Sequence, residues 1–407
     1  MRASLPLRVL HVVTAFPYRE DDVLTPWLWG LLRYLRDSFG MDIHVLAASH
    51  RGEQGRDLWG FRVHRFRYAP SRWETFTYEA AIPEMLKREP WRTLLVPPYV
   101  LGGFLQAQRL ARKVTFDVVH VHWPIPLAAF AFPFRRRKIP IFHTYYTAEL
   151  TLARKIRPLA KPLVRTADQW VAISSYAADL LRPFLRSQDR SRIEILPFSA
   201  AIEAGTFRPP RTISPEPRIL FVGRMVERKG VPVLLRAAQR LKNRIPSLRL
   251  IFVGDGPLRK TWEAQAHALG LQDRVTFTGK ISQEALERAY LSSDIFVLPA
   301  IVDSRGDTEG LGVVLLEALQ YGLPVIASRV GGIVDIVQHE STGLLVPPGD
   351  PEALAHAIQR LVDHPEFTQT LVLKGQQHLK KNFTLESIAK RLVDLYRRLQ
   401  TSSRSTP

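Results

Sequence analysis

The sequence contains no cysteine among its 407 residues, and this absence removes several kinds of chemistry. A chain without thiols has no disulfides, no thiolate nucleophile and no cysteine ligands for zinc or an iron–sulfur cluster. The chain also lacks an apolar run of about 18 residues, the length that a membrane-spanning helix needs. Its first residues do not follow the pattern of a signal peptide. We therefore expect a cytoplasmic protein.

Acidic residues are scarce relative to basic ones. The chain has 57 Lys and Arg against 38 Asp and Glu, a formal net charge of +19, and most of the excess lies in residues 1–200. Such a charge attracts nucleic acid, an anionic membrane surface or phosphorylated small molecules, and composition alone does not choose among them. The hydrophobic share of 46% is ordinary for globular proteins, and the length predicts more than one domain.

Short apolar runs alternate with segments of helical periodicity, which is typical of βα units on a parallel sheet. In the first half, the predicted strands are Val9–Val13, Ile43–Ala47, Val118–Val121, Ile139–His143, Trp170–Ile173 and Ile193–Leu196. In the second half, they are Ile219–Val222, Leu250–Val253, Val275–Thr278, Ile295–Leu298, Val325–Ala327 and Gly343–Val346. The predicted fold class is α/β, with two Rossmann-like halves facing across a cleft at the carboxyl ends of their strands.

A proline-rich stretch that cannot form regular helix separates the two halves. We predict an N-terminal domain in residues 1–200, a linker in residues 201–217 and a second domain in residues 218–382. An amphipathic pattern then predicts a closing helix in residues 383–400, and we expect a frayed tail in residues 401–407.

The most informative segment begins at Glu309 and reads E-G-L-G-V-V-L-L-E-A-L-Q-Y-G-L-P-V-I-A. The residues from Gly310 to Gly312 can open a helix whose free N–H groups and positive dipole end would hold a phosphate. Glu317 follows Glu309 by about 12 Å along a helix, at 1.5 Å per residue, which suits carboxylates on either side of a diphosphate. Two solvated surface glutamates are the simpler alternative, but the apolar neighbours of Glu317 argue against it.

This segment resembles the E-x7-E motif of the retaining glycosyltransferases of family 4, also described as glycosyl transferases group 1, which have the GT-B fold. The resemblance covers essentially all of residues 217–407. It implies a hexosyltransferase that uses a nucleoside-diphosphate sugar, retains the anomeric configuration and needs no metal or other cofactor. It also implies a saccharide or lipid-linked acceptor, a place in cell-surface polysaccharide or glycolipid biosynthesis, and a final helix that crosses back to the N-terminal domain.

Three further loops match the family in the expected order, and together with the first segment they form the expected donor site. The residues that the resemblance assigns to the donor are Gly223, Arg224, Lys229, Gly254, Lys280, Ile281, Glu309, Gly310, Leu311, Gly312 and Glu317. Arg224 and Lys229 are two cations beside a glycine between a strand and a helix, a good clamp for a diphosphate. A basic loop without a ligand is the alternative. Asp255 is interpreted as a turn residue.

The acceptor side carries weaker signals. The candidate acceptor residues are Asp22, His122, Trp123 and His143. The resemblance implies that His143 helps to position the donor sugar, and it joins Glu309, Arg224 and Lys229 as a candidate catalytic residue; a packing histidine is the alternative. His120 and His122 alternate onto one face of a strand, so a metal pair is conceivable, but no third ligand is evident and no metal site is predicted.

A basic run at Arg135–Lys138, and basic residues interleaved with apolar ones at Arg154–Arg165, are consistent with peripheral binding to the anionic inner face of the cytoplasmic membrane, and equally with solvated faces. No nucleic-acid partner is expected. Three alternatives stay open: a GT-B-fold nucleotide-sugar 2-epimerase or phosphorylase, a non-catalytic nucleotide-sugar sensor, and a polyanion-binding or nucleic-acid-binding protein. The base, the sugar and the acceptor are not predicted.

Overall fold

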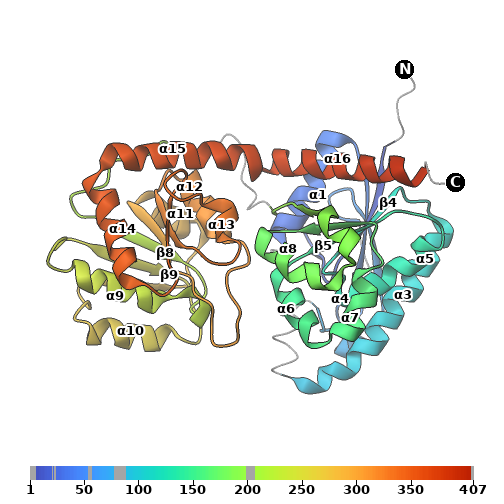
Figure 1. The fold of residues 1–407 in the computed structure, drawn as a ribbon. Helices are drawn as coiled ribbons and strands as arrows, with labels where there is room; N and C mark the ends of the chain where they lie inside the picture. Colours follow the sequence, from blue (N-terminus) through green and yellow to red (C-terminus); the bar gives the residue numbers. More distant parts are fainter. Residues whose placement is uncertain are drawn as a thin grey trace. The chain divides into compact units, whose positions relative to one another are not determined.

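The computed structural model describes the chain except for residues 1–5, 21, 23, 54–56, 78–88, 199–206 and 405–407. Its contacts divide the chain into two compact units. Unit 1 comprises Met1–Ile173, Ala177–Ala201 and Ile388–Pro407, and unit 2 comprises Ser174–Tyr176 and Ile202–Ser387. Each unit is a parallel sheet covered by helices, so the predicted α/β fold class is confirmed (Figure 1). The two units are described one at a time.

The sheet of unit 1 has seven parallel strands in the order β3-β2-β1-β4-β5-β6-β7. Their bounds are β1 (Arg8–Val12), β2 (Asp42–Ala48), β3 (Arg62–Phe66), β4 (Val118–His122), β5 (Ile141–Tyr145), β6 (Gln169–Ala172) and β7 (Ile193–Ile195). The order reverses between the neighbouring strands β1 and β4, because the chain adds strands first on one side and then on the other. In such sheets the carboxyl ends at the reversal are the usual place for a ligand.

Strand β3 was not predicted. Its sequence, Arg62-Val-His-Arg-Phe, buries only Val63 and Phe66, so it lacks the apolar run that marks the other strands. It pairs with β2 alone and forms an edge of the sheet, where polar side chains are tolerated. The predicted strand Ile139–His143 begins two residues too early, since β5 starts at Ile141, after Pro140.

The helices of unit 1 are α1 (Pro26–Phe39), α3 (Val96–Lys113), α4 (Pro124–Leu127), α5 (Phe132–Arg135), α6 (Thr147–Lys155), α7 (Arg157–Val164) and α8 (Ser175–Leu181). Short 3-10 turns lie at Ser71–Trp73, Pro90–Leu95, Ala128–Ala131, Arg182–Phe184 and Ser187–Arg192. Helix α1 begins at a proline and ends at Gly40, whose φ of 63° suits glycine. Its buried leucines recur every three or four residues and face the sheet.

The sheet of unit 2 has six parallel strands in the order β10-β9-β8-β11-β12-β13. Its strands are β8 (Arg218–Val222), β9 (Arg249–Val253), β10 (Val275–Gly279), β11 (Ile295–Leu298), β12 (Val325–Ser328) and β13 (Leu344–Val346). Its helices are α9 (Val231–Leu241), α10 (Arg259–Ala268), α11 (Gln283–Leu291), α12 (Val313–Gln320), α13 (Ile333–Ile336), α14 (Pro351–Asp363) and α15 (Pro365–Asn382), with a 3-10 turn at Glu227–Lys229. Here the strand order reverses between β8 and β11.

The last helix, α16 (Leu385–Arg404), follows unit 2 in the chain but belongs to unit 1 from Ile388 onward. The hydroxyl of Tyr396 lies 2.5 Å from Nδ1 of His120 in β4, and the Gln400 amide donates to the Asp117 carboxylate over 2.6 Å. Buried apolar residues of this helix complete the core of unit 1. The predicted frayed tail is wrong for residues 401–404, which are helical, and residues 405–407 lie outside the described chain.

The described part of the predicted linker, residues 207–217, contains no helix or strand. It nevertheless packs on unit 2, because the N–H of Arg208 donates to the carbonyl of Gln320 and the side-chain amide of Gln376 donates to the carbonyl of Arg208. Among the helices that the structure describes, none combines the length and the apolar character needed to cross a bilayer.

Candidate functional site

Two loops meet at the strand reversal of unit 2. Lys229 follows β8 and Glu309 follows β11, and Nζ of the lysine lies 2.5 Å from Oε2 of the glutamate. Only 9% of the lysine side chain and 13% of the glutamate side chain are exposed. Water screens such a shielded pair weakly, so each charge depends on the other for its stability. Both residues were predicted, and the fold brings them into direct contact.

The pair fixes the charge of the glutamate. Burial raises the pKa of Glu309, but the charge and hydrogen bond of Lys229 and the charge of Arg228 outweigh this effect, so that the pKa lies below its ordinary value. Glu309 is therefore an ionised hydrogen-bond acceptor at neutral pH. Its carboxylate can accept hydrogen bonds from hydroxyl groups, and it holds the lysine in the loop after β8.

Glycines allow these loops to approach closely. Gly230 has a φ of 65°, and a Cβ added there would lie 1.8 Å from the carbonyl oxygen of Pro299 at the end of β11. Any side chain at this position would separate the two loops that carry the ion pair. Gly254 has a φ of 124°, and a Cβ added there would lie 2.1 Å from the carbonyl oxygen of Gly223. At the ends of β8 and β9, the two backbones thus approach each other with no side chain between them.

Helix α12 begins beside the ion pair. Its N-cap is Gly312, with a φ of 90° and no side chain that caps the first turn. The adjoining Leu311 is buried, and the N–H of Gly332 donates to the carbonyl of Glu309, which fixes the loop before the helix. The positive end of α12 is therefore held next to Glu309 without a side-chain anion of its own.

Glu317 lies on α12 as predicted, but it has a protein partner that the sequence did not reveal. The hydroxyl of Tyr290 in α11 donates to Oε2 of Glu317 over 2.7 Å. Burial raises the pKa of Glu317, and the hydrogen bond from Tyr290 offsets part of that rise. The tyrosine fixes the carboxylate, and the other oxygen of Glu317 is left for a further donor such as a ribose hydroxyl.

The remaining donor candidates lie on neighbouring loops of unit 2. Arg224 is exposed in the loop after β8, Lys280 is exposed after β10, and Ile281 is half-buried. The carboxylate of Asp255 accepts from the N–H of Gly256 over 2.7 Å, which agrees with its interpretation as a turn residue. Strand-end backbone, a buried cation, an ionised acceptor and a helix N-terminus thus meet at one edge of this sheet.

A different group of side chains occupies the strand reversal of unit 1. His11 of β1 lies beside His120 and His122 of β4, all three are buried, and their nitrogens lie within 4.8 Å of one another. No third metal ligand beside His120 and His122 was predicted from the sequence, and the structure corrects this because His11 lies beside both. The signal was present in the sequence, because a histidine interrupts the apolar first strand, but only the pairing of β1 with β4 brings it to the other two.

Hydrogen bonds already engage most of these nitrogens. Nδ1 of His11 lies 3.1 Å from Nε2 of His122, whose Nδ1 lies 3.2 Å from the hydroxyl of Tyr146. His120 contacts the hydroxyls of Tyr396 and Thr144 with its two nitrogens. Burial, reinforced by the neighbouring histidines, lowers the pKa of His120 and of His122 well below the ordinary value. The three imidazoles are therefore neutral and belong to two separate hydrogen-bonded groups, one of His11, His122 and Tyr146 and the other of His120, Tyr396 and Thr144.

His143 of β5 is completely buried. Its Nδ1 lies 2.9 Å from the hydroxyl of Tyr145, whereas its Nε2 has no hydrogen-bond partner among the described residues. Burial, and to a smaller extent the charge of Arg135, lowers its pKa to about 3. A neutral imidazole with one unpaired nitrogen fits both the predicted positioning role and a packing role.

The other acceptor candidates adjoin the carboxyl ends of β1 and β4. Trp123 follows β4 with a φ of 52° and stacks on Tyr146, with ring centroids 4.4 Å apart. Trp27 and Phe198 complete this aromatic cluster. The carboxylate of Asp22 accepts from backbone N–H groups of its own loop, so its observed role is to shape that loop.

The architecture identifies the class of protein first. A sucrose-phosphate synthase from Thermosynechococcus elongatus aligns over 97% of this chain with a TM-score of 0.71 and 24% identity, and covers 100% of its own chain. The Anabaena protein HepE, solved in complex with UDP, aligns over 96% of this chain with a TM-score of 0.70 and 17% identity, and is also covered completely. These likenesses establish the fold, two Rossmann-like units of the GT-B architecture.

Sequence comparison then identifies the family. The family described as Glycosyl transferases group 1 matches residues 206–378, and Glycosyltransferase Family 4 matches residues 27–198. The D-rhamnosyltransferase WbpZ of Pseudomonas aeruginosa is 30% identical over 70% of this chain and 74% of its own length. The chain therefore belongs to the glycosyltransferase family that these two descriptions, Glycosyl transferases group 1 and Glycosyltransferase Family 4, define.

Other relatives match over shorter parts. An uncharacterized glycosyltransferase of Methanocaldococcus jannaschii is 32% identical over 45% of this chain and 45% of its own length. A GDP-mannose-dependent phosphatidylinositol monomannoside mannosyltransferase of Mycobacterium tuberculosis is 28% identical over 59% of this chain and 65% of its own length. The match thus spans about half to two thirds of these two relatives.

The buried histidines predict how stability depends on pH. Burial lowers the pKa of His11 to about 3, as it does for His143, so both stay neutral when folded and take up protons when unfolded below about pH 6.5. The free energy of unfolding of unit 1 should therefore fall as the pH falls, by about 1 kcal/mol per histidine between pH 7 and 5.5.

Urea unfolding followed by tryptophan fluorescence measures this dependence. Trp262 is the only tryptophan in the sequence of unit 2, so the fluorescence reports mainly on unit 1. His143→Gln should flatten the pH dependence, whereas His356→Gln, at an exposed histidine, should leave it unchanged. Equal slopes in the wild type and His143→Gln would contradict the analysis.

The ion pair predicts a selective loss of nucleotide binding. Lys229→Met removes a charge that a diphosphate would contact and leaves Glu309 buried without its partner. Affinity for nucleoside diphosphates should fall by about tenfold to a hundredfold, measured by calorimetry. Lys374→Met, at an exposed lysine of α15, removes the same charge elsewhere in unit 2 and should change affinity little. Equal losses in the two variants would show that only net charge matters.

Proposed function

We propose that this protein transfers a glycosyl unit from a nucleoside-diphosphate sugar to a hydroxyl of a saccharide or lipid-linked acceptor, with retention, in cell-surface polysaccharide or glycolipid biosynthesis. The observation that carries the proposal is the shielded Lys229–Glu309 pair at the strand reversal of unit 2. Support comes from relatives named as a phosphatidylinositol monomannoside mannosyltransferase, a D-rhamnosyltransferase and an amylovoran biosynthesis glycosyltransferase.

The pair can exchange partners when the donor arrives. The diphosphate attracts Lys229, and the N-terminus of α12 and the exposed Arg224 supply further positive potential. Glu309 then loses its lysine and gains sugar hydroxyls as replacement donors, which keeps the buried carboxylate hydrogen-bonded. The same ion pair thereby supplies a cation for the diphosphate and a hydrogen-bond acceptor for the sugar.

The reaction breaks the bond between the anomeric carbon and the diphosphate oxygen and forms a bond from that carbon to the acceptor oxygen, while the proton of the acceptor hydroxyl passes to the departing diphosphate. Negative charge accumulates on the departing diphosphate, and the positive groups of the site stabilise it. No side chain is assigned as a covalent nucleophile. Roles for His143 at the donor sugar, and for Asp22, His122 and Trp123 at the acceptor, remain predictions from the family resemblance.

A donor screen followed by turnover measurements tests the proposal. We expect one nucleoside diphosphate and its sugar to raise the melting temperature, since ligands that bind only the native state stabilise it. With that donor, Glu309→Gln should lower kcat by about a hundredfold or more, because a neutral amide replaces the ionised acceptor. Lys374→Met is the matched control. Chelator treatment should leave the wild-type rate unchanged, and nuclear magnetic resonance of the product should show the donor's anomeric configuration.

Three outcomes would overturn the proposal. Binding without turnover in the presence of varied acceptors would favour a nucleotide-sugar sensor. Epimerised sugar or sugar phosphate as the product would favour an epimerase or a phosphorylase. Silence of the whole donor panel, combined with steeply salt-dependent binding to any polyanion, would favour a nucleic-acid-binding or polyanion-binding protein.

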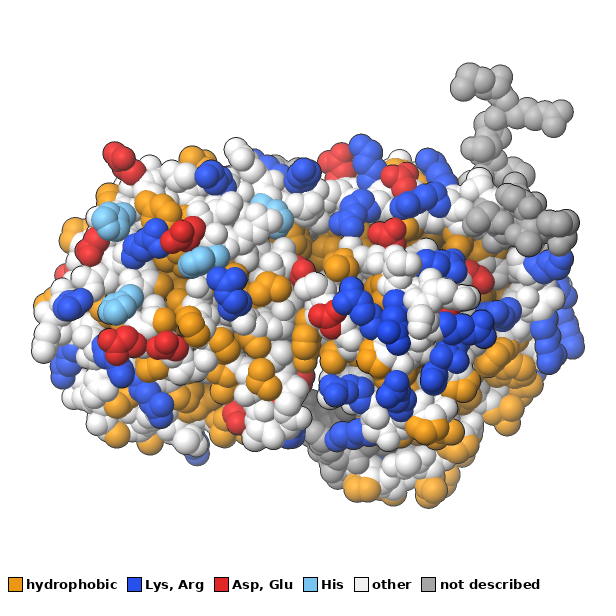
Figure 2. Space-filling view, in the orientation of Figure 1, with side chains coloured by type: hydrophobic (Ala, Val, Ile, Leu, Met, Phe, Trp, Pro, Cys, Tyr) orange, Lys and Arg blue, Asp and Glu red, His pale blue; other side chains and the backbone are white. Residues whose placement is uncertain are grey.

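We also propose that unit 1 binds an anionic membrane surface. Helices α6 and α7 expose Leu152, Ile156 and Leu159, the last to 73%, between the exposed cations Arg154, Lys155 and Arg157. Lys and Arg side chains gather on the visible face of this unit, with hydrophobic side chains beside them (Figure 2). Each cation near such a surface contributes about 1 kcal/mol, and the leucines can enter the interface.

Cosedimentation tests this contact with vesicles of phosphatidylglycerol and phosphatidylcholine in equal parts, and with vesicles of phosphatidylcholine alone. The wild type should sediment with the anionic vesicles only. Leu152→Ser/Leu159→Ser should weaken binding by about tenfold, because two exposed apolar side chains are lost. Leu373→Ser, at an exposed leucine of unit 2, is the control. Wild-type protein that stays in the supernatant with both vesicles would contradict the proposed contact.

A further inference from the structure

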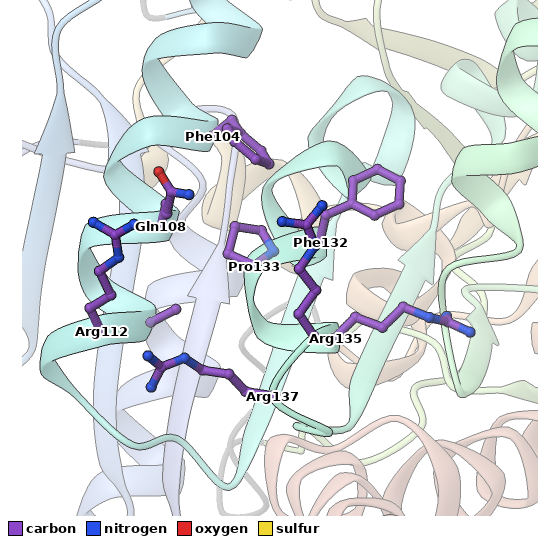
Figure 3. A pocket seen from close by; sticks show the side chains of 9 residues that line it. Phe104, Gln108, Arg112, Phe132, Pro133, Arg135 and Arg137 are labelled. Atoms are coloured by element: carbon purple, nitrogen blue, oxygen red, sulfur yellow. The ribbon is translucent and has the colours of Figure 1, made fainter.

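Unit 1 contains a cavity that shares no residue with the candidate donor and acceptor sites. It has a volume of about 620 Å³ and lies between α3 and α5 (Figure 3). Helix α3 contributes Phe104, Gln108, Ala111 and Arg112, and α5 with the turn after it contributes Phe132, Pro133, Arg135, Arg136 and Arg137. Cavities of roughly 300–1,000 Å³ commonly bind small molecules.

The place of this cavity in the fold separates it from the predicted acceptor site. Helix α3 ends at Lys113, just before β4 begins, and α5 ends at Arg135, just before β5 begins. Both helix ends therefore lie at the edge where the strands start. The histidine cluster and Trp123 lie at or near the opposite, carboxyl edge. The cavity shares no residue with the donor site of unit 2.

Four arginines line the cavity. Among the described residues, no Asp or Glu forms an ion pair with Arg112, Arg135, Arg136 or Arg137. Arg135 donates to the carbonyl of Thr166, which fixes its direction but leaves its charge uncompensated. Lys113 and Lys138 add two exposed cations at the same edge. All four arginines are exposed, so water and salt screen their repulsion in part, and a bound anion would reduce it further.

Helix dipoles do not account for this convergence. Cations at a helix C-terminus are stabilised, but α5 is a single turn of four residues, and only Arg112 and Lys113 lie in the last turn of α3. The carbonyl ends of both helices would repel an anion. Any anion in the cavity must therefore be held by the side chains, mainly by guanidinium groups, which pair with phosphate oxygens through two hydrogen bonds at once.

Apolar side chains form the other wall. Phe104 is half-buried and Phe132 is 40% exposed, while Ala111 and Pro133 are buried beneath them. Two leucines nearer the start of α3, Leu101 and Leu105, are also exposed. A bare phosphate ion would leave this wall uncovered, whereas a phosphate carried by an apolar group would cover it.

We propose that this cavity, the arginine pocket, binds the phosphate ester of an amphiphile, with the phosphate on the guanidinium groups and the apolar part against Phe104 and Phe132. The inference goes beyond the proposed transfer reaction, because the arginine pocket would anchor a phosphorylated compound at the far edge of unit 1. The same chemistry is offered by the headgroup of an anionic phospholipid and by a free phosphorylated metabolite.

Calorimetry at low salt with dihexanoyl phosphatidylglycerol below its micelle concentration tests the arginine pocket, with glycerol phosphate and inorganic phosphate in parallel. The full chain should bind the lipid at one saturable site. Arg112→Gln/Arg137→Gln should weaken binding by about a hundredfold, because two charge-assisted contacts are lost. Arg109→Gln/Arg186→Gln removes the same charge from two exposed arginines outside the arginine pocket and should change affinity little. Circular dichroism verifies that both variants fold.

The outcomes test the apolar part of the ligand. Tight binding of the lipid with weak binding of glycerol phosphate supports a phosphate ester that carries an apolar group, as a membrane lipid does. The reverse would overturn the proposal, because glycerol phosphate has no apolar group to cover Phe104 and Phe132. Equal losses in the two double variants, or no binding of any phosphate compound, would overturn the proposal. Turnover with a water-soluble acceptor should be unchanged in Arg112→Gln/Arg137→Gln, so failure of the arginine pocket is distinguishable from failure of the transferase proposal.

Discussion

The ion pair between Lys229 and Glu309 is the interaction on which the donor site depends. Two opposite charges shielded from water are stable only together, so each loop at the strand reversal is held in place by the other. The close approach requires Gly230, whose backbone touches the end of β11. In the proposed function, a diphosphate would attract the lysine and sugar hydroxyls would donate to the glutamate, so this one contact would supply both a cation and a hydrogen-bond acceptor.

The strand reversals of the two units carry different kinds of side chain. At its strand reversal, unit 2 carries charges and bare backbone, whereas unit 1 carries neutral histidines and an aromatic cluster. Charges suit a diphosphate, and aromatic rings with neutral hydrogen-bonding groups suit a sugar face. Two basic regions of unit 1 lie elsewhere, one on α6 and α7 and one at the arginine pocket. Both are separate from its strand reversal.

Much of the fold and part of the site followed from local patterns. Every predicted strand exists, because buried parallel strands are short apolar runs, but the polar edge strand β3 gave no such signal. The glycine-flanked Glu309 and the basic loop with Lys229 were both predicted. Their contact across 80 residues was not, nor was the hydroxyl of Tyr290 on Glu317, nor the meeting of His11 with His120 and His122. Each depends on which strands and helices become neighbours.

The sequence by itself determined the α/β class, the family resemblance and most of the residue types at the donor site, because these depend on short segments and their spacing. Only the tertiary structure decided which of these residues neutralise one another. The same holds for the arginine pocket, since Arg112 of α3 and Arg137 of the turn after α5 meet at one cavity only through packing. Charge and burial act over distances in space, and the order of strands in a sheet, rather than the order along the chain, sets those distances.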